Sequence, residues 1–261
     1  MIRAGVVQTR TGITPAANAA ALSAAVADLA GQGADIVFTP EMSGVLDRDA
    51  KRLLAHGLDE ANEPTLAALR EVAAARGVLV AIGSLAVCRP DGRVANRSYL
   101  IGRDGAIVQT YDKLHLFDVD LGAGGRYRES ATYAPGDAVR LADTDLGRLG
   151  FSICYDVRFP ALYAALARAG ALLIPVPAAF TRPTGEAHWH VLLRARAIET
   201  GAFIVAAAQT GRHEDGRETY GHSLVVDPWG RVLLDMGEEP GVALVELDPA
   251  LVADARALIP S

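Results

Sequence analysis

The chain of 261 residues is longer than a typical single domain, but α/β folds of this length often remain undivided, and we predict one domain over residues 1–261. Its composition, 51% hydrophobic and 21% charged, is typical of a globular protein with a large core and excludes a disordered chain. A net charge of −6 provides no basic surface for nucleic acid or an anionic membrane, so neither is expected as a partner.

The two cysteines, Cys88 and Cys154, are far apart and have no metal-ligand spacing, which favours a reducing compartment. Residues 1–8 lack the hydrophobic region of a signal peptide, and no apolar run approaches the length of a membrane span. We therefore expect a cytoplasmic protein.

The N-terminal half alternates buried strands with helices. Thr14-Pro15 begins an alanine-rich helix, and a second helix over 63–76 ends at Gly77. Asp104-Gly105 is typical of a hairpin, so the sheet is expected to be mixed. The glycine-rich residues 121–128 predict a loop, without the spacing of a phosphate-binding motif. The strands are expected at 2–8, 35–38, 78–83, 94–102 and 106–111.

The C-terminal half repeats this alternation. The apolar run 149–153 predicts a buried strand, Pro160 opens a helix, and 171–176 completes a right-handed βαβ unit. A long helix is expected over 184–200, with Thr184 as its N-cap. Later strands are expected at 203–208, 224–226, 231–234 and 242–247. The pattern predicts an α/β fold in which two sheets face each other with helices outside.

Three chemically distinctive side chains follow the ends of predicted strands. They are Glu41, Lys113 and Cys154. Each has an ordinary explanation on its own, because loop carboxylates and lysines are commonly solvated and a free cysteine often packs as a small apolar residue. Ligands of open α/β sheets, however, bind beyond the carboxyl ends of strands. The three positions together therefore suggest a site.

The three groups suit attack on an amide or nitrile carbon. A thiolate is the nucleophile, and a neutral thiol requires a base. A carboxylate in an apolar crevice is expected to have a raised proton affinity, which suits Glu41 to accept the thiol proton and return it. The ammonium of Lys113 would offset the charge on the oxygen of the tetrahedral intermediate. Cys154 as nucleophile, Glu41 as base and Lys113 as electrostatic stabiliser form our hypothesis.

The segments around these residues resemble the signature blocks of the nitrilase superfamily of carbon–nitrogen hydrolases. The resemblance covers essentially the whole chain and implies a four-layer αββα sandwich with two mixed sheets, a Glu–Lys–Cys triad and a homodimer or higher homo-oligomer. It also implies a supporting role for Glu129 near Lys113 and the substrate. The three blocks are Phe38-Thr39-Pro40-Glu41, Tyr111-Asp112-Lys113-Leu114-His115 and Gly150-Phe151-Ser152-Ile153-Cys154-Tyr155-Asp156.

Within this superfamily, residues 184–200 and 211–223 are most similar to the deaminated glutathione amidase branch, followed by the omega-amidase branch. The resemblance implies a cysteine amidase that acts on a small, carboxylate-bearing amide. An omega-amidase, an N-carbamoyl or aliphatic amide or nitrile hydrolase, and a non-catalytic interaction protein remain alternatives. Deviations from the branch are the glycine-rich 121–128 segment and Arg182.

Substrate contacts are expected around Cys154. Arg158 is predicted to bind the substrate carboxylate, although pairing with Asp156 or another acid is the alternative. Arg182 and Arg212 are weaker candidates for a second carboxylate. The predicted substrate-binding residues, partly by resemblance, are Tyr155, Arg158, Phe180 and Thr184.

No metal or organic cofactor is expected, because side chains fill every role in the hypothesised reaction. His188 and His190 are two residues apart on a predicted helix and therefore point in different directions, with no third ligand at helical spacing. His115 is expected to be structural.

Overall fold

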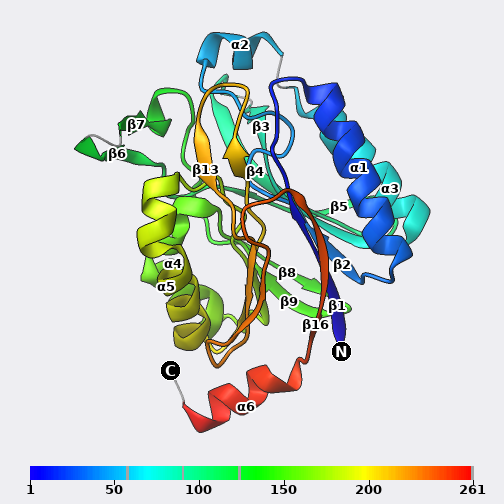
Figure 1. The fold of residues 1–261 in the computed structure, drawn as a ribbon. Helices are drawn as coiled ribbons and strands as arrows, with labels where there is room; N and C mark the ends of the chain where they lie inside the picture. The colour runs from blue at the N-terminus through cyan, green and yellow to red at the C-terminus, as the bar shows by residue number, and fades with distance from the viewer. Residues whose placement is uncertain (57–58, 90, 123–124, 260–261) are drawn as a thin grey trace.

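A computed structural model describes residues 1–56, 59–89, 91–122 and 125–259. Two mixed six-stranded sheets form the centre of the molecule, and helices lie on their outer sides (Figure 1). The arrangement is the predicted αββα sandwich. In the part of the chain that the structure describes, no helix has the length and apolar character needed to cross a membrane.

The first sheet has the strand order β16-β1-β2-β3-β4-β5. Its central strands β1, β2 and β3 are parallel, whereas β16, β4 and β5 pair antiparallel to their neighbours. Helices α1 (Pro15–Gly31) and α3 (Pro64–Arg76) lie side by side on its outer face (Figure 1). The strands are β1 (Ile2–Gln8), β2 (Ile36–Phe38), β3 (Leu79–Cys88), β4 (Val94–Ile101), β5 (Ile107–Asp112) and β16 (Gly241–Leu247).

The second sheet has the order β15-β14-β11-β10-β9-β8. Strands β9, β10 and β11 are parallel, and the pairs β8–β9, β11–β14 and β14–β15 are antiparallel. Helices α4 (Pro160–Arg168) and α5 (Arg182–Thr200) lie on the opposite side of the molecule from α1 and α3 (Figure 1). The strands are β8 (Leu141–Thr144), β9 (Gly147–Gly150), β10 (Leu173–Pro175), β11 (Phe203–Ala206), β14 (Leu224–Val226) and β15 (Val232–Asp235).

The core is divided by the first sheet. On its outer face, Leu22 and Val26 of α1 pack with Leu69 of α3 and with alternate strand residues such as Val37. Phe38, one residue further along β2, belongs instead to the cluster shared with the second sheet and its helices. Burial of each such side chain contributes about 1.5–3 kcal/mol, so both faces of the sheet are strongly specified. This fixes the register of β2 and therefore the place where Glu41 leaves it.

The remaining elements lie around the ends of the sheets. The β6–β7 hairpin extends away from the sandwich, and α6 follows β16 at the C-terminal end (Figure 1). These elements are α2 (Ala50–Ala55), β6 (Asp118–Asp120), β7 (Arg126–Arg128), β12 (Thr210–Arg212), β13 (Glu218–Tyr220), α6 (Ala250–Leu258) and the 3₁₀ turns Glu60–Asn62, Glu129–Ala131 and Cys154–Arg158.

Several predicted boundaries are wrong. Part of the expected 121–128 loop is strand β7, which pairs with β6; Ala123 and Gly124 lie outside the described residues. The strand expected over 149–153 ends at Gly150. Helix α5 begins at Arg182, with Thr181 at the N-cap, so Thr184 lies inside its first turn and its hydroxyl contacts that of Thr181 at 2.8 Å.

Candidate active site

Glu41 follows β2 in a backbone turn that β3 supports. A Cβ at Gly83 would lie 2.1 Å from the Thr39 carbonyl oxygen, so only glycine lets the two backbones approach this closely. The Ser84 hydroxyl accepts a hydrogen bond from the N–H of Met42 at 2.9 Å. Met42 itself has φ 55°, an uncommon conformation for a residue with a side chain. These contacts determine where the Glu41 carboxylate lies.

Lys113 follows β5 and is almost completely buried. Its backbone N–H donates to the Asn96 carbonyl of β4 at 2.9 Å, and its carbonyl accepts from the N–H of Gly136 at 2.8 Å. Its side chain is 1% exposed. An ammonium that deep is costly unless it is paired and hydrogen-bonded, and the structure supplies the partners.

The Lys113 ammonium lies between two carboxylates. Its Nζ is 2.9 Å from Glu41 Oε1 and 2.9 and 3.1 Å from the two oxygens of Glu129. The remaining oxygen of Glu41 accepts from the Ala179 N–H at 2.8 Å, and Glu129 Oε2 accepts from the Phe117 N–H at 2.6 Å. The structure therefore brings Glu129 to Lys113, as the resemblance implied.

Cys154 lies in the turn between β9 and α4. Its φ is 48°, and its N–H donates to the Pro177 carbonyl at 2.8 Å. Such a left-handed conformation costs on the order of 1–3 kcal/mol and persists only where the surroundings hold it, which is common at functional sites.

Asp156 connects the Cys154 turn to the Lys113 loop. One carboxylate oxygen accepts from the Tyr111 hydroxyl at 2.7 Å and from the Ile153 N–H at 2.9 Å. The other accepts from the backbone N–H of His115 at 3.0 Å and contacts its ring Nδ1 at 2.7 Å. His115 also stacks on Phe159. These contacts are those expected of a structural His115.

The protonation states follow from burial and from Lys113. Burial raises the pKa of Glu41, but the Lys113 ammonium and the hydrogen bonds to the carboxylate outweigh burial, so its pKa lies below the ordinary value. The expected rise in the proton affinity of this carboxylate was therefore wrong for the resting protein. Burial and the Glu41 carboxylate raise the pKa of the Cys154 thiol well above its usual range. The resting group is thus a neutral thiol beside an ionised carboxylate and an ammonium.

Asn96 is a site residue that the sequence analysis missed. Its amide Nδ2 donates to Glu41 Oε1 at 2.9 Å and to Glu129 Oε1 at 3.1 Å. It is fully buried in β4, and its own amide oxygen has no hydrogen-bond partner among the described residues. Asparagine is depleted in strands, so an Asn inside the strand predicted over 94–102 was the available signal.

A cavity of about 860 Å³ reaches these residues. Its size lies in the range of about 300–1,000 Å³ that is usual for small-molecule sites. Among the residues predicted from the sequence, those that line it are Glu41, Lys113, Glu129, Cys154, Tyr155, Phe180, Arg182 and Thr184.

Arg158 and Arg212 are not among the described residues that line this cavity. The guanidinium carbon of Arg158 lies 5.9 Å from the ring centre of Tyr155 and 5.6 Å from that of Phe180, and Arg158 Nη2 donates to His188 Nδ1 at 3.1 Å. Arg158 thus lies against the aromatic wall, without an acid partner among the described residues, and its contact with substrate stays a prediction.

Arg182 lines the cavity but is already bound to three carboxylates. Its guanidinium lies 3.0 to 3.3 Å from oxygens of Glu186, Glu218 and Glu238. A substrate carboxylate would have to compete with all three, which makes Arg182 a poor second carboxylate site.

The fold and the site define a hydrolase of the nitrilase type, and the chain belongs to the carbon–nitrogen hydrolase family. It matches the family described as Carbon-nitrogen hydrolase over residues 3–257. The protein is therefore an enzyme of this class.

Named relatives and solved structures show which members of this family the chain is similar to. Over 211 residues, 80% of this chain and 72% of the relative, it is 44% identical to the deaminated glutathione amidase of Yersinia enterocolitica. The C. elegans NitFhit protein superposes with a TM-score of 0.93 at 35% identity, over 99% of this chain but 63% of that longer chain. A variant of the amidase from Nesterenkonia sp. AN1 superposes with a TM-score of 0.82 at 28% identity, covering 99% of this chain and 98% of the other, and shows Michael addition of acrylamide at its active-site cysteine.

Proposed function

We propose that this enzyme hydrolyses the amide of deaminated glutathione, with Cys154 as nucleophile. The observation that carries the proposal is the thiol, carboxylate and ammonium group lining one cavity. The named amidase relatives support the substrate class, and the modified active-site cysteine of the Nesterenkonia amidase supports the role of Cys154. All groups needed for the reaction below belong to the chain itself.

The first half of the reaction forms a thioester. Glu41 takes the proton of the Cys154 thiol as the sulfur attacks the amide carbon, because the thiol is neutral at rest. The Lys113 ammonium stabilises the negative charge that appears on the amide oxygen. Glu41 then transfers the proton to the nitrogen, the carbon–nitrogen bond breaks, and ammonia leaves.

The second half hydrolyses the thioester. Glu41 removes a proton from water as the water oxygen attacks the acyl carbon, and the same ammonium stabilises the second tetrahedral intermediate. The carbon–sulfur bond breaks, the carboxylic acid product leaves, and Cys154 recovers its proton. Glu129 and Asn96 hold Lys113 and Glu41 in place through both halves.

Arginine side chains in the cavity wall support the proposal that the substrate carries a carboxylate. Arg48 and Arg128 line the cavity, and no salt bridge joins either to a carboxylate among the described residues. Arg126 and Arg217, by contrast, already pair with Asp120 and Asp215. We propose that Arg48 or Arg128 binds the carboxylate of the peptide-like tail, whereas Arg158, after a side-chain rotation, binds the carboxylate nearer the amide.

Ammonia release from two amides tests the substrate. Deaminated glutathione should be hydrolysed with a higher kcat/KM than α-ketoglutaramate, which lacks the tail. Arg48→Ala or Arg128→Ala should raise KM for the longer substrate about tenfold, since a charged hydrogen bond contributes about 1.5–3 kcal/mol, and leave the shorter substrate unchanged. Equal or reversed preference in the parent enzyme would instead assign it as an omega-amidase.

We also infer a homodimer, supported by an exposed apolar surface on the second sheet side. Val191 and Ile198 lie seven residues apart on the same face of α5, and Gly230, beside the exposed Trp229, packs against Ile198. Such contiguous patches mark interaction sites. Light scattering should give twice the chain mass of 27.4 kDa, and Ile198→Asp should shift it to one chain mass. A monomeric parent would exclude this assignment.

We also propose that residues 1–261 form a single domain, which is supported by a family match that covers residues 3–257. A cytoplasmic location is supported by the requirement for a reduced Cys154 and by two free cysteines.

A further inference from the structure

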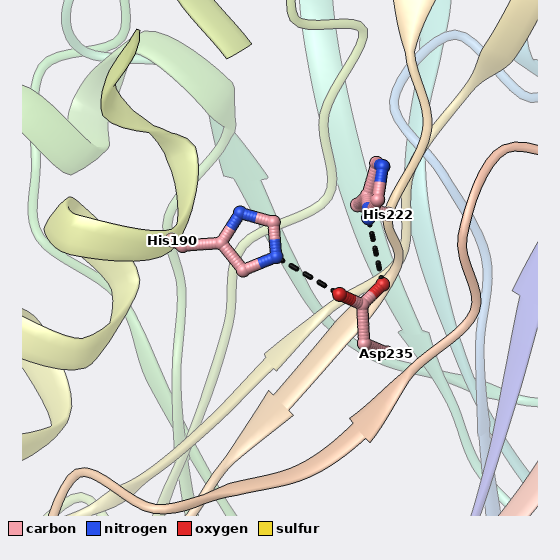
Figure 2. A group of neighbouring side chains, drawn as sticks. All are labelled: His190, His222 and Asp235. Atoms are coloured by element: carbon pink, nitrogen blue, oxygen red, sulfur yellow. Dashed lines mark hydrogen bonds and ion pairs between the residues drawn. The ribbon is translucent and has the colours of Figure 1, made fainter. Parts of the chain in front are cut away.

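Two imidazoles and a carboxylate meet near Trp189, whose indole donates to the His222 carbonyl. His190 is on α5, His222 lies between β13 and β14, and Asp235 ends β15 (Figure 2). Within residues 1–56, 59–89, 91–122 and 125–259, this is the one group of three or more His, Cys, Asp or Glu side chains whose ligand atoms converge, all within 4.8 Å of one another.

We propose that His190, His222 and Asp235 form a binding site for a divalent transition metal such as Zn²⁺. Two imidazole nitrogens and one carboxylate oxygen are a ligand set that zinc uses, and a water would complete four-coordination. Magnesium and calcium prefer sites made of oxygen ligands, so they are not the expected ions.

The two histidine–aspartate distances fit a small ion after a slight expansion. His190 Nε2 is 2.9 Å from Asp235 Oδ2, and His222 Nδ1 is 2.8 Å from Asp235 Oδ1 (Figure 2). Ligands about 2.0–2.1 Å from zinc in a tetrahedral site lie about 3.3 Å from each other. The two His–Asp contacts therefore have to open by a few tenths of an ångström, whereas the two imidazole nitrogens, which lie within 4.8 Å of each other, have to settle at the same spacing.

Neighbouring groups already hold the three side chains. His222 has φ 52°; its N–H donates to the Gly237 carbonyl at 2.7 Å, and its carbonyl accepts from Trp189 Nε1 at 2.8 Å. Tyr220 stacks on the His222 ring at 4.5 Å. Asp235 Oδ1 also accepts from the Gly237 N–H at 3.0 Å. Such supporting contacts orient ligands and are a usual feature of metal sites.

An ion here would join α5 to β15 behind the cavity wall. Trp189, whose indole bonds to His222, packs against Phe180 with ring centres 4.8 Å apart, and Phe180 lines the cavity. The site is therefore separate from the Cys154 group but adjoins the element that shapes its cavity.

Zinc titration of tag-free, EDTA-treated and dialysed protein tests the site. The parent for this experiment is Cys154→Ala, because a cysteine sulfur beside two carboxylates would compete for zinc by losing its proton to the metal. Calorimetry should show one Zn²⁺ per chain. His190→Gln and Asp235→Asn should each weaken binding at least ~100-fold, since loss of even an outer-shell partner typically costs 10–100-fold.

His188→Gln is the matched control, since it removes another histidine of α5 outside the group and should bind zinc as the parent does. Circular dichroism of all variants in EDTA confirms that each one is folded, and Co²⁺ absorption spectra provide a second readout. Zinc binding that is unchanged in His190→Gln and Asp235→Asn, or absent from the folded parent, would overturn the proposal.

Discussion

Two groups of charged and polar side chains in this enzyme contain similar chemistry but differ in burial. Around Lys113, the side chains are 1% exposed for Lys113, 6% for Glu41 and 13% for Glu129. The His190, His222 and Asp235 side chains are 34%, 21% and 35% exposed. In both groups, carboxylate oxygens lie 2.8 to 3.1 Å from the side-chain nitrogens of lysine or histidine.

Burial determines how strongly each charged group depends on its protein neighbours. Deep in the protein, each charge depends on its neighbours, because removing one partner leaves another uncompensated at a cost of several kcal/mol. Near the surface, water replaces a lost partner and pairs contribute about 0–1 kcal/mol. Substitutions in the first group should therefore abolish or strongly reduce activity, whereas those in the second should be mild unless a metal is present.

Removal of the nucleophile should have the largest effect. Cys154→Ala should have no measurable amidase activity, while the protein stays folded, because one sulfur atom is lost from a position that is otherwise backbone-restrained. Mass spectrometry of the parent with a slow substrate should show an acyl adduct on Cys154.

The exposed Cys88 is the matched control for this prediction. Cys88→Ala should retain full activity and form the same adduct. Substantial turnover by Cys154→Ala, or an adduct on Cys88, would rule out the proposed mechanism.

Loss of the base should have the next largest effect. Glu41→Gln preserves shape and some hydrogen bonds but cannot accept the thiol proton, so kcat should fall about 10²–10⁴-fold. Single-turnover assays should show the loss in thioester formation, the step in which the neutral thiol must be deprotonated. If the variant kept most of its kcat, Glu41 would not be the base.

Asn96 should show a smaller effect that identifies a positioning role. Asn96→Ala removes the donor shared by Glu41 and Glu129, and kcat should fall about 10–100-fold, as for outer-shell partners of metal sites. The hydrogen bond from Asn96 contributes to the lowered pKa of Glu41, so its loss should move the acid limb of the kcat/KM profile to higher pH.

A general loss of packing would lower kcat without moving that acid limb. An Asn96→Ala profile that is lower but unshifted would therefore assign Asn96 a purely structural role. The melting temperature, measured in parallel, separates the two explanations.

The sequence predicted the layers and the chemistry but not the supporting contacts. Hydrophobic runs and capping residues located the strands and helices, and short motifs located Glu41, Lys113 and Cys154. Asn96 escaped because β4 is buried on both faces, so the alternation that tells inside from outside is missing. Strand β7 escaped because it lies in an exposed hairpin with no apolar pattern.

The group formed by His190, His222 and Asp235 could not be predicted from the sequence, for a different reason from that given for Asn96 and β7. The three residues of this group come from a helix, a loop and a strand end, and only the tertiary packing of α5 against the second sheet brings them together. No local spacing encodes such packing. The position of Arg158 against Tyr155 and Phe180 likewise depends on rotamers that spacing does not determine.

The smallest expected effect belongs to Asp235 in the absence of metal. Asp235→Asn keeps the shape of the side chain and removes one charge from a group that solvent reaches, so the free energy of unfolding in EDTA should change by less than about 1 kcal/mol. Urea denaturation of the parent and the variant measures this difference. With excess Zn²⁺ the parent alone should gain stability, because a ligand that binds only the folded state stabilises it by RT ln(1 + [L]/Kd). A loss of several kcal/mol in EDTA would mean that Asp235 behaves like a buried partner of Lys113, and the contrast between the two groups would be wrong.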